Sequence, residues 1–238
     1  MQAVILAGGL GTRLKTVAGD LPKALVLVSG RPFIEHQLEL LRKNGFDDVL
    51  LCIGYKGEMI EEHLGDGAAF GLKVSYSRES PARLLGTGGA LINAFPMLHK
   101  AFMVLYGDSY LPTDYSQIMR AFASKNTPAL MCVYRNENKW DRSNVRIEGS
   151  SVIFYSKKSG GEKSDYIDYG LSIYRKSVME TYLSAVLPLD LALIQEDLVA
   201  RRQMEAYIVK ERFYEIGKPS GLAELEKHLK GVGKNNKM

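Results

Sequence analysis

Three glycines, an arginine and a lysine near the N-terminus have the types and spacing of a polyphosphate-binding site. They lie in Leu6–Leu14 (LAGGLGTRL), which continues the apolar run Gln2–Leu6, and in Pro22-Lys23. Glycines remove the side chains that would keep a phosphate away from backbone N–H groups. Arg13 offers a fixed fork of donors for phosphate oxygens, and Lys23 adds a mobile cation on a loop stiffened by proline. The stretch therefore predicts a polyphosphate held by backbone, arginine and lysine together.

Two common phosphate loops do not match this stretch. The dinucleotide fingerprint G-x-G-x-x-G would begin at Gly9 and requires glycine where the chain has Leu14. The P-loop requires Gly-Lys-Ser/Thr, whereas here Lys15-Thr16 follows a leucine. The stretch resembles the signature of the sugar nucleotidyltransferases, L-A-G-G-x-G-T-R-L followed by P-K, and matches it residue for residue. A tight structural turn is the alternative interpretation.

The resemblance implies a reaction and its partners. An NTP and a sugar 1-phosphate, both small molecules, would give an NDP-sugar and pyrophosphate for the synthesis of surface polysaccharides. The branch that looks closest is that of the mannose- or heptose-1-phosphate guanylyltransferases, which favours GTP. Muramic-acid-type uridylyltransferases are similar in size. Donors such as UTP or CTP, and a non-sugar phosphate as acceptor, remain alternatives.

The resemblance also implies a mechanism without a protein nucleophile, because the acceptor phosphate attacks the α-phosphorus directly. Arg13 and Lys23 would be the catalytic cations, and Mg²⁺ the cofactor. The residues of the N-terminal loop that the resemblance assigns to the nucleotide are Leu6, Ala7, Gly8, Gly9, Gly11 and Thr12.

Two carboxylates could hold the metal ion. Asp108 follows the buried run Phe102–Tyr106, and a carboxylate at the end of a central strand, beside a polyphosphate loop, suits Mg²⁺. A simple turn at Gly107-Asp108 is the alternative. The resemblance supplies the second ligand, because Phe213–Pro219 matches a late strand that ends in an acid. Many members have aspartate there and this chain has Glu215, whose carboxylate reaches one methylene further.

A second glycine cluster, Leu85–Ala90 (LGTGGA), could open a helix and let a base and ribose approach the backbone closely. In the resembled family L-G-T-G-G lies at the base pocket, often with an acidic residue upstream. The residues implied to bind the nucleotide here are Glu79, Gly86, Thr87 and Gly88. The Glu79 carboxylate could accept from guanine N1–H and N2–H₂, or from the exocyclic amine of another base. A plain helix N-terminus is the alternative.

For the acceptor, Tyr166–Gly170 (YIDYG) occupies the place of the family segment I-N-x-G-I-Y, which contacts sugar hydroxyls. Asp168 replaces the usual asparagine, and an ionised carboxylate only accepts hydrogen bonds. The resemblance therefore leaves the identity of the sugar open. Lys157 matches the family lysine that reaches the sugar phosphate, with a solvated basic turn as the alternative. The substrate-binding residues implied are Tyr106, Gly107, Lys157, Asp168, Tyr169 and Gly170.

A rival from another class is a nucleotide-sugar-binding protein of the glycosyltransferase type. Such enzymes carry an Asp-x-Asp metal motif, and Gly107–Tyr110 (GDSY) lacks its second aspartate.

Strand and helix patterns alternate through the first half and must position these residues. Strands are predicted at Gln2–Leu6, Asp48–Ile53, Leu72–Ser77, Phe102–Tyr106 and Ala129–Tyr134, and helices at residues 33–41, 58–64 and 115–124. This order predicts an α/β fold with a mostly parallel central sheet and helices on both faces. Ligands of such sheets lie beyond the carboxyl ends of the strands, where Gly8–Arg13 would sit.

The second half predicts shorter elements. Strands are expected at Val145–Ile147, Val152–Tyr155, Tyr166–Tyr174 and Phe213–Ile216, and helices after a capping box at Ser177–Glu180 and at residues 191–202 and 221–230. The first three strands indicate a small β-rich excursion that binds the sugar. With the resemblance, this predicts a three-layer, Rossmann-like nucleotide-diphospho-sugar transferase fold. We expect a single domain, residues 1–238, with a nucleotide-binding half (1–135), a sugar-phosphate-binding half (136–218) and a C-terminal helix with a basic tail (219–238).

The bulk composition limits the partners. The net charge of +4 is accounted for by four lysines in residues 227–238, which we interpret as a frayed basic tail, so no nucleic-acid surface is predicted. No apolar stretch is long enough to span a membrane, and the first apolar run ends in the glycine loop, unlike a signal peptide. Cys52 and Cys132 are isolated and expected to be buried as free thiols in the cytoplasm. A homo-oligomer is compatible with these expectations.

Overall fold

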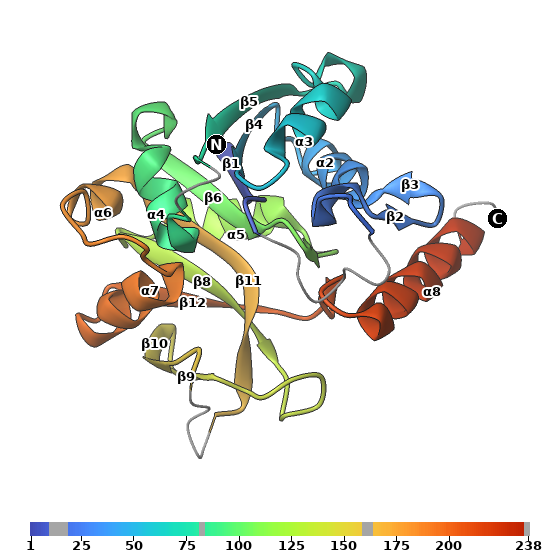
Figure 1. Cartoon of the computed structure of the whole chain (residues 1–238). Helices are drawn as coiled ribbons and strands as arrows, with labels where there is room; N and C mark the ends of the chain where they lie inside the picture. Colours follow the sequence, from blue (N-terminus) through green and yellow to red (C-terminus); the bar gives the residue numbers. More distant parts are fainter. Residues whose placement is uncertain (10–18, 81–83, 159–163, 236–238) are drawn as a thin grey trace.

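A nine-stranded sheet runs through the centre of the molecule (Figure 1). The computed structural model describes residues 1–9, 19–80, 84–158 and 164–235. The sheet order is β5-β4-β1-β6-β11-β8-β12-β10-β9. Its strands in chain order are β1 (Gln2–Leu6), β4 (Asp48–Ile53), β5 (Lys73–Arg78), β6 (Ala101–Tyr106), β8 (Ala129–Arg135), β9 (Val145–Glu148), β10 (Ser151–Tyr155), β11 (Tyr166–Arg175) and β12 (Met204–Val209). β1 lies inside the sheet and every residue of it is buried, as its continuous apolar sequence predicts.

The strands β5, β4, β1 and β6 pair in parallel, as the alternation of strand and helix patterns predicts. The register places Leu6 between Cys52 of β4 and Tyr106 of β6, so three carboxyl ends meet at one edge. β11 runs antiparallel to both β6 and β8, whereas β8 and β12 are parallel. The sheet is therefore parallel over its first half and mixed as a whole.

The β-rich excursion expected from the sequence continues this same sheet. β9 pairs with β10 and with the start of β11, and β10 pairs with β12. The sequence does not predict β12, because its polar and apolar residues do not alternate regularly. In the structure, only Met204 and Val209 of this strand are buried. Its pairing with β8, far away in the chain, gives the segment its strand conformation.

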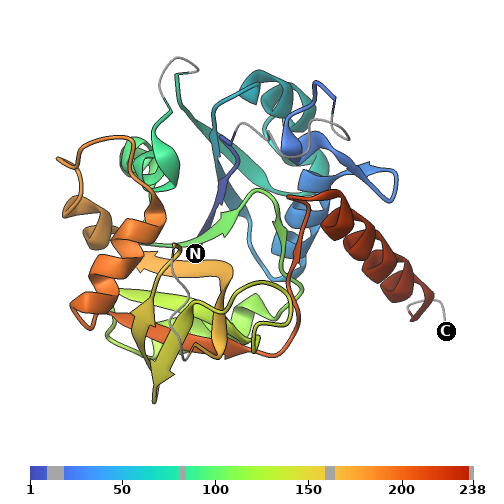
Figure 2. The same ribbon diagram turned by 60° about the horizontal axis from the view of Figure 1, so that its bottom comes forward.

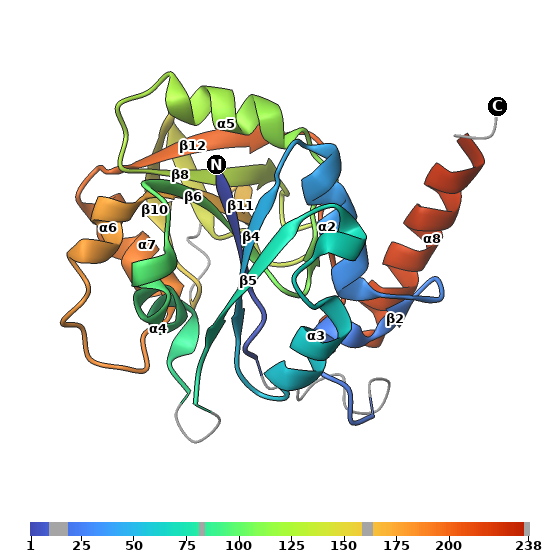
Figure 3. The ribbon, with the colours of Figure 1, turned by 90° about the horizontal axis from the view of Figure 1, so that it is seen from above.

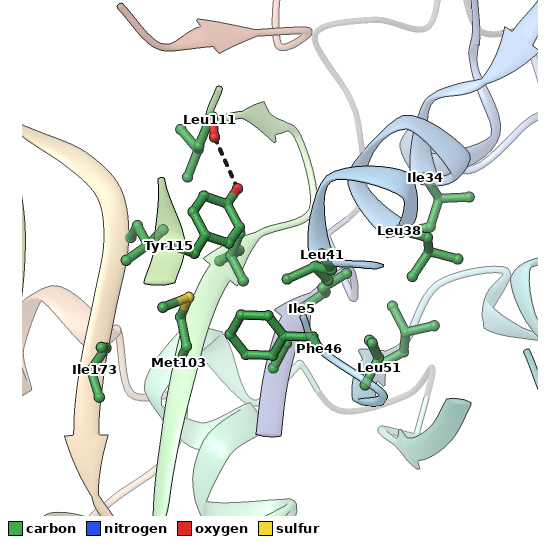
Figure 4. Close-up of a cluster of buried hydrophobic side chains, with 14 of the residues drawn as sticks. Ile5, Ile34, Leu38, Leu41, Phe46, Leu51, Met103, Leu111, Tyr115 and Ile173 are labelled. Atoms are coloured by element: carbon green, nitrogen blue, oxygen red, sulfur yellow. Dashed lines mark hydrogen bonds between the residues drawn. The ribbon is translucent and has the colours of Figure 1, made fainter. Parts of the chain in front are cut away.

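Helices cover both faces of the sheet, which confirms the three-layer prediction (Figure 3). One face carries α2 (Phe33–Lys43), α3 (Gly57–Leu64) and α5 (Tyr115–Ala123), and the other carries α4 (Gly86–Asn93), α6 (Lys176–Glu180) and α7 (Leu191–Ala200). Figure 4 shows the first layer, where Ile34, Leu38 and Leu41 of α2 lie over the sheet residues Ile5 and Leu51. These apolar positions recur at helical spacing, so one stripe of α2 faces the sheet.

The last helix, α8 (Pro219–Asn235), packs beside the small ribbons and leads away from the sheet (Figure 2). Leu225 of α8 is buried with Val28, Phe33 and Ile216. The ribbons are β2 (Leu27–Val28) with β3 (Arg31–Pro32), and β7 (Ser109–Tyr110) with β13 (Tyr214–Glu215). Short 3₁₀ helices lie at η2 (Lys23–Leu25), η3 (Ala68–Phe70) and η4 (Phe95–Met97).

Two local predictions from the sequence need correction. The basic segment interpreted as frayed is helical up to Asn235, because α8 extends well beyond the expected end. The proposed capping box is also wrong: Ser177 lies inside α6, whose N-cap residue Arg175 makes no side-chain capping bond. Both cysteines are buried and free, as expected. Over the described part of the chain, none of the helices has the length and apolarity that crossing a lipid bilayer requires.

Candidate active site

A pocket of about 370 Å³ lies at the carboxyl ends of β1, β4 and β6. It brings together most of the residues that the sequence assigns to the nucleotide and the metal. The lining residues are Leu6, Ala7, Gly8, Gly9, Lys23, Ala24, Cys52, Glu79, Leu84, Gly86, Thr87, Ala90, Tyr106, Gly107 and Asp108. The predicted loop residues Gly11, Thr12 and Arg13 lie outside the described part of the chain.

Gly107 lets the turn that carries Asp108 approach the N-terminal loop. A Cβ at Gly107 would lie 2.8 Å from the Leu6 carbonyl oxygen and 3.0 Å from the Ala7 Cα, both backbone atoms that cannot rotate away. The Gly107 N–H donates to the same Leu6 carbonyl at 2.9 Å. Only glycine fits this contact, so Gly107 lets the turn that carries Asp108 pack directly against the N-terminal loop.

Lys23 and Asp108 form an ion pair inside the pocket. The Lys23 Nζ donates to the Asp108 Oδ2 at 2.8 Å, and the two side chains are 17% and 31% exposed. Lys23 begins η2, directly after the extended Pro22. The proline restricts the loop just before the lysine, which helps to fix the position of the ammonium group. The predicted cation and the first predicted metal ligand are thus next to each other.

The β7–β13 ribbon places Glu215 beside this pair. Glu215 pairs with Ser109, and the Ile216 N–H donates to the Asp108 carbonyl at 2.9 Å. Glu215 remains open to water. Partial loss of hydration and the like charge of Asp108 raise the pKa of Glu215 to about 6, while Lys23 opposes the shift. Two carboxylates that repel each other at an open site are a suitable donor set for a divalent cation.

Magnesium fits this donor set better than a softer metal. Within the described ranges, no cluster of three or more histidine, cysteine, aspartate or glutamate residues could bind a metal by itself. Mg²⁺ usually takes one or two carboxylates and completes its octahedron with waters and substrate phosphates. Asp108 and Glu215 meet that requirement, since both offer hard carboxylate oxygens next to the expected phosphate site.

Glu79 follows β5 and faces the same pocket. Its Oε2 accepts from the Leu85 N–H at 3.1 Å, which ties the residues before α4 to the end of β5. Burial raises the pKa of the half-buried Glu79 carboxyl group, and the Leu85 N–H opposes that shift. The Oε1 atom lies so close to Gly8 that a Cβ there would stand 3.1 Å away. Glu79 is therefore positioned to contact a ligand seated on the N-terminal loop.

The glycine cluster at the start of α4 forms hydrogen bonds with the segment before α7. The N–H groups of Gly88 and Gly89 donate to the Leu189 carbonyl at 2.9 and 3.1 Å, and the Leu189 N–H donates to the Leu85 carbonyl at 2.8 Å. Gly86 has a φ of +76°, and a Cβ on it would lie 2.4 Å from the Leu189 oxygen. Gly86 and Thr87 line the pocket, whereas Gly88 does not. The Gly88 N–H is thus bonded to the loop before α7, while the predicted contact of Gly88 with a nucleotide stays a prediction.

Asp190 connects a residue predicted to bind the nucleotide with one predicted to bind the acceptor, and the sequence pattern did not single it out. The Thr87 hydroxyl donates to the Asp190 Oδ1 at 2.9 Å, and the Lys157 Nζ donates to Oδ2 at 2.6 Å. Burial opposes the charge on Asp190, but the bonds from Lys157 and from the Ala192 N–H hold its pKa below the usual range. An aspartate just before an apolar helix is an N-cap pattern, which could have identified its place but not its partners.

Three residues predicted to bind the acceptor, Asp168, Tyr169 and Gly170, lie at an irregularity in the pairing of β11. Its pairing with β8 breaks between Asp168 and Ser172, and Gly170 has a φ of +84°. The Asp168 carboxylate accepts from the Gly170 N–H at 2.9 Å and from the Tyr155 hydroxyl at 3.3 Å. Burial raises the pKa of Asp168 to about 6 against these bonds. Bulges of this kind often redirect a side chain near a functional site.

This bulge lies next to the turn that carries Asp108. A Cβ at Gly170 would be 3.5 Å from the Tyr106 ring and 3.6 Å from the Ser109 hydroxyl. Tyr169 is an exception among the predicted acceptor residues, because its side chain is 1% exposed and its ring packs edge-on against Phe213. The Tyr169 side chain therefore belongs to the core and does not reach a substrate.

Comparison with known proteins matches nearly the whole chain to one protein family. The family model described as nucleotidyl transferase matches residues 2–231. The D-glycero-α-D-manno-heptose 1-phosphate guanylyltransferase of Campylobacter jejuni is 31% identical, with 76% of this chain and 79% of that protein covered. The protein of the same name from Aneurinibacillus thermoaerophilus is 28% identical, with coverage of 96% and 98%.

A solved structure shares the fold of this chain over nearly its whole length. HddC from Yersinia pseudotuberculosis superposes with a TM-score of 0.78 at 28% identity, over 96% of this chain and 99% of that one. The same protein complexed with GMP-PN superposes with a TM-score of 0.77.

Proposed function

The chain belongs to the nucleotidyl transferase family, and from that premise we propose that it transfers the guanylyl group of GTP to a sugar 1-phosphate. The acceptor is a heptose or mannose 1-phosphate, and the products are a GDP-sugar for glycoconjugate synthesis and pyrophosphate. The names of two relatives, both heptose 1-phosphate guanylyltransferases, support this assignment. The observation that carries it is the Lys23–Asp108 pair in a glycine-lined pocket, with Glu215 beside the pair on the next strand.

The chemistry requires positioning and charge stabilisation. An oxygen of the acceptor phosphate attacks the α-phosphorus in line, the new P–O bond forms, and the bond to the β-phosphate oxygen breaks to release pyrophosphate. Lys23 and Arg13 donate to phosphate oxygens and stabilise the charge that develops on the leaving group. Asp108 and Glu215 would hold Mg²⁺, which would supply positive charge to neutralise the phosphates. No proton needs to move, so the site needs no general base.

The nucleotide takes the first half of the chain, residues 1–135, and the backbone of Leu6–Gly9 cradles its phosphates. Glu79 accepts from the adjacent N1–H and N2–H₂ donors of guanine, and Gly86 and Thr87 border the same pocket. Uracil offers only one such donor, so a carboxylate at this place favours GTP over UTP.

The acceptor takes residues 136–218. Lys157 binds its phosphate, and Asp168 accepts from its hydroxyl groups, because both carboxylate oxygens keep free lone pairs after the Gly170 and Tyr155 bonds. Beyond the acceptor half lies the closing helix α8 (Pro219–Asn235). A cytoplasmic location is part of the proposal, supported by two buried thiols that remain free.

The test is pyrophosphate release from GTP, UTP, CTP and dTTP, each against a panel of sugar 1-phosphates and one amine phosphate. We expect the highest kcat/KM with GTP and a heptose or mannose 1-phosphate, and a narrower gap between GTP and UTP in Glu79→Gln. A preference for CTP or UTP would contradict the base assignment. Turnover with the amine phosphate alone would favour the alternative in which Asp168 recognises a cationic acceptor.

A further inference from the structure

A buried glutamine of α2 holds both ends of the turn that carries Asp108. The Gln37 Nε2 donates to the Tyr106 carbonyl at 2.9 Å and to the Ser109 carbonyl at 2.8 Å. Gln37 is 2% exposed, and it lies 69 and 72 residues away from these partners in the chain. One side chain therefore joins a helix on one face of the sheet to both carbonyl groups that flank Gly107-Asp108.

The orientation of the Gln37 carboxamide follows from its partners. Both are carbonyl oxygens, which only accept, so the NH₂ group must face them. The Oε1 atom is buried and finds no hydrogen-bond partner in the described part of the protein. An unpaired buried acceptor costs free energy that an apolar residue would avoid. A glutamine at position 37 is therefore not explained by stability alone, which favours a functional role for its two hydrogen bonds.

These two donations fix the Asp108 turn from inside the molecule. On its other sides, the Gly107 N–H donates to the Leu6 carbonyl and the Asp108 carbonyl accepts from the Ile216 N–H. Ser109, whose carbonyl Gln37 binds, is also the residue that pairs with Glu215. Movement of the turn would change the position of both carboxylates at once.

We propose that Gln37 is a positioning residue for the Mg²⁺ ligands, one that sets the placement of Asp108 and Glu215 without contacting metal or substrate. The inference rests on the proposed function, in which these two carboxylates hold the ion. Loss of an outer hydrogen bond that orients metal ligands typically weakens metal binding about 10–100-fold.

Gln195 provides a matched control. It is 1% exposed, its Nε2 donates to the Tyr174 hydroxyl at 3.0 Å and to the Ser172 hydroxyl at 3.3 Å, and its Oε1 is likewise buried without a partner among the described residues. It lies on α7, on the opposite face of the sheet from α2. Substitution of Gln195 removes the same number of buried donations without touching the Asp108 turn.

The experiment compares Gln37→Met with Gln195→Met, since methionine has the same length and no donor. Binding of Mn²⁺ to each protein with a non-hydrolysable GTP analogue is followed by electron paramagnetic resonance, without turnover. We expect at least about a tenfold weaker Mn²⁺ affinity in Gln37→Met and less than about threefold in Gln195→Met. If Gln37→Met does not fold, Gln37→Asn tests the same point, because the shorter carboxamide cannot reach both carbonyl groups.

Two results would overturn the inference: wild-type Mn²⁺ affinity in the folded Gln37 variant, or equal weakening in both glutamine variants. The second would mean that general loss of stability explains the effect. A wild-type protein that binds the GTP analogue with no dependence on Mn²⁺ would instead contradict the proposed function, so the two failures are distinguishable.

Discussion

The contact between Gly86 and the Leu189 carbonyl makes a specific prediction about stability. In Gly86→Ala the new Cβ would stand 2.4 Å from the Leu189 oxygen, 2.8 Å from its carbonyl carbon and 3.1 Å from its nitrogen. All three are backbone atoms, so no side chain can turn aside and the segment before α7 must move. Gly86 also has a positive φ, which an L-residue with a side chain adopts at a cost of about 1–2 kcal/mol.

The size of the effect follows from the bonds that the movement breaks. Leu189 accepts from Gly88 and Gly89 and donates to Leu85, and each such bond contributes about 0.5–1.5 kcal/mol. With the cost of the positive φ, we expect Gly86→Ala to lower the free energy of unfolding by about 3–6 kcal/mol. That is a large fraction of the about 5–15 kcal/mol that stabilises a typical protein.

The assay is urea unfolding, with Gly30→Ala as the matched control. Gly30 also has a positive φ, +82°, but no described atom lies within 4 Å of its would-be Cβ. It should therefore lose only the conformational cost, about 1–2 kcal/mol. Equal losses in the two variants would refute the argument that the approach of the Leu189 backbone requires glycine at position 86.

Three further predictions concern the charged groups. Asp190→Asn keeps an oxygen for the Thr87 hydroxyl but loses the charge that holds Lys157. The KM for the sugar phosphate should therefore rise about tenfold, while the KM for GTP stays within about twofold. A rise in the KM for GTP alone would contradict the role of Asp190 in placing Lys157. Asp108→Asn should require at least about tenfold more Mg²⁺ for half-maximal activity, and an unchanged metal titration would remove Asp108 from the site. Burial raises the folded-state pKa of Asp168 to about 6, so the stability that the protonated group allows is lost as the pH rises from about 4 to 6 and does not change further above that. Relative to Asp168→Asn, the wild type should lose about 1–3 kcal/mol of unfolding free energy between pH 4 and 7, and parallel pH profiles would contradict this.

The sequence predicts those parts of the site that follow from local patterns. The run Gln2–Leu6 has the exact bounds of β1 because a continuous apolar stretch before a glycine loop has few other stable arrangements. Asp48–Ile53 and the carboxyl end of Phe102–Tyr106 are confirmed for the same reason. The pocket at their carboxyl ends then follows from the parallel arrangement of these strands.

Residues whose role depends on distant partners could not be predicted in this way. Asp190 meets Thr87 across 103 positions, and Gln37 meets Ser109 across 72. A single sequence contains no pattern for such contacts, since they depend on how the helices pack against the sheet. The glycine cluster at Gly86 illustrates the opposite error: a pattern typical of ligand binding is partly occupied by a backbone carbonyl of the same chain.

The central claim is that one pocket joins GTP to a sugar 1-phosphate. The most direct measurement is mass spectrometry of the products after incubation with GTP, Mg²⁺ and heptose or mannose 1-phosphate, with pyrophosphate measured in parallel. We expect a GDP-sugar and pyrophosphate in equal amounts, and rates lower by about 10²–10³ in Lys23→Ala, which removes one preorganised donor. Absence of any GDP-sugar, or an undiminished rate in a folded Lys23→Ala variant, would contradict the assignment of this pocket.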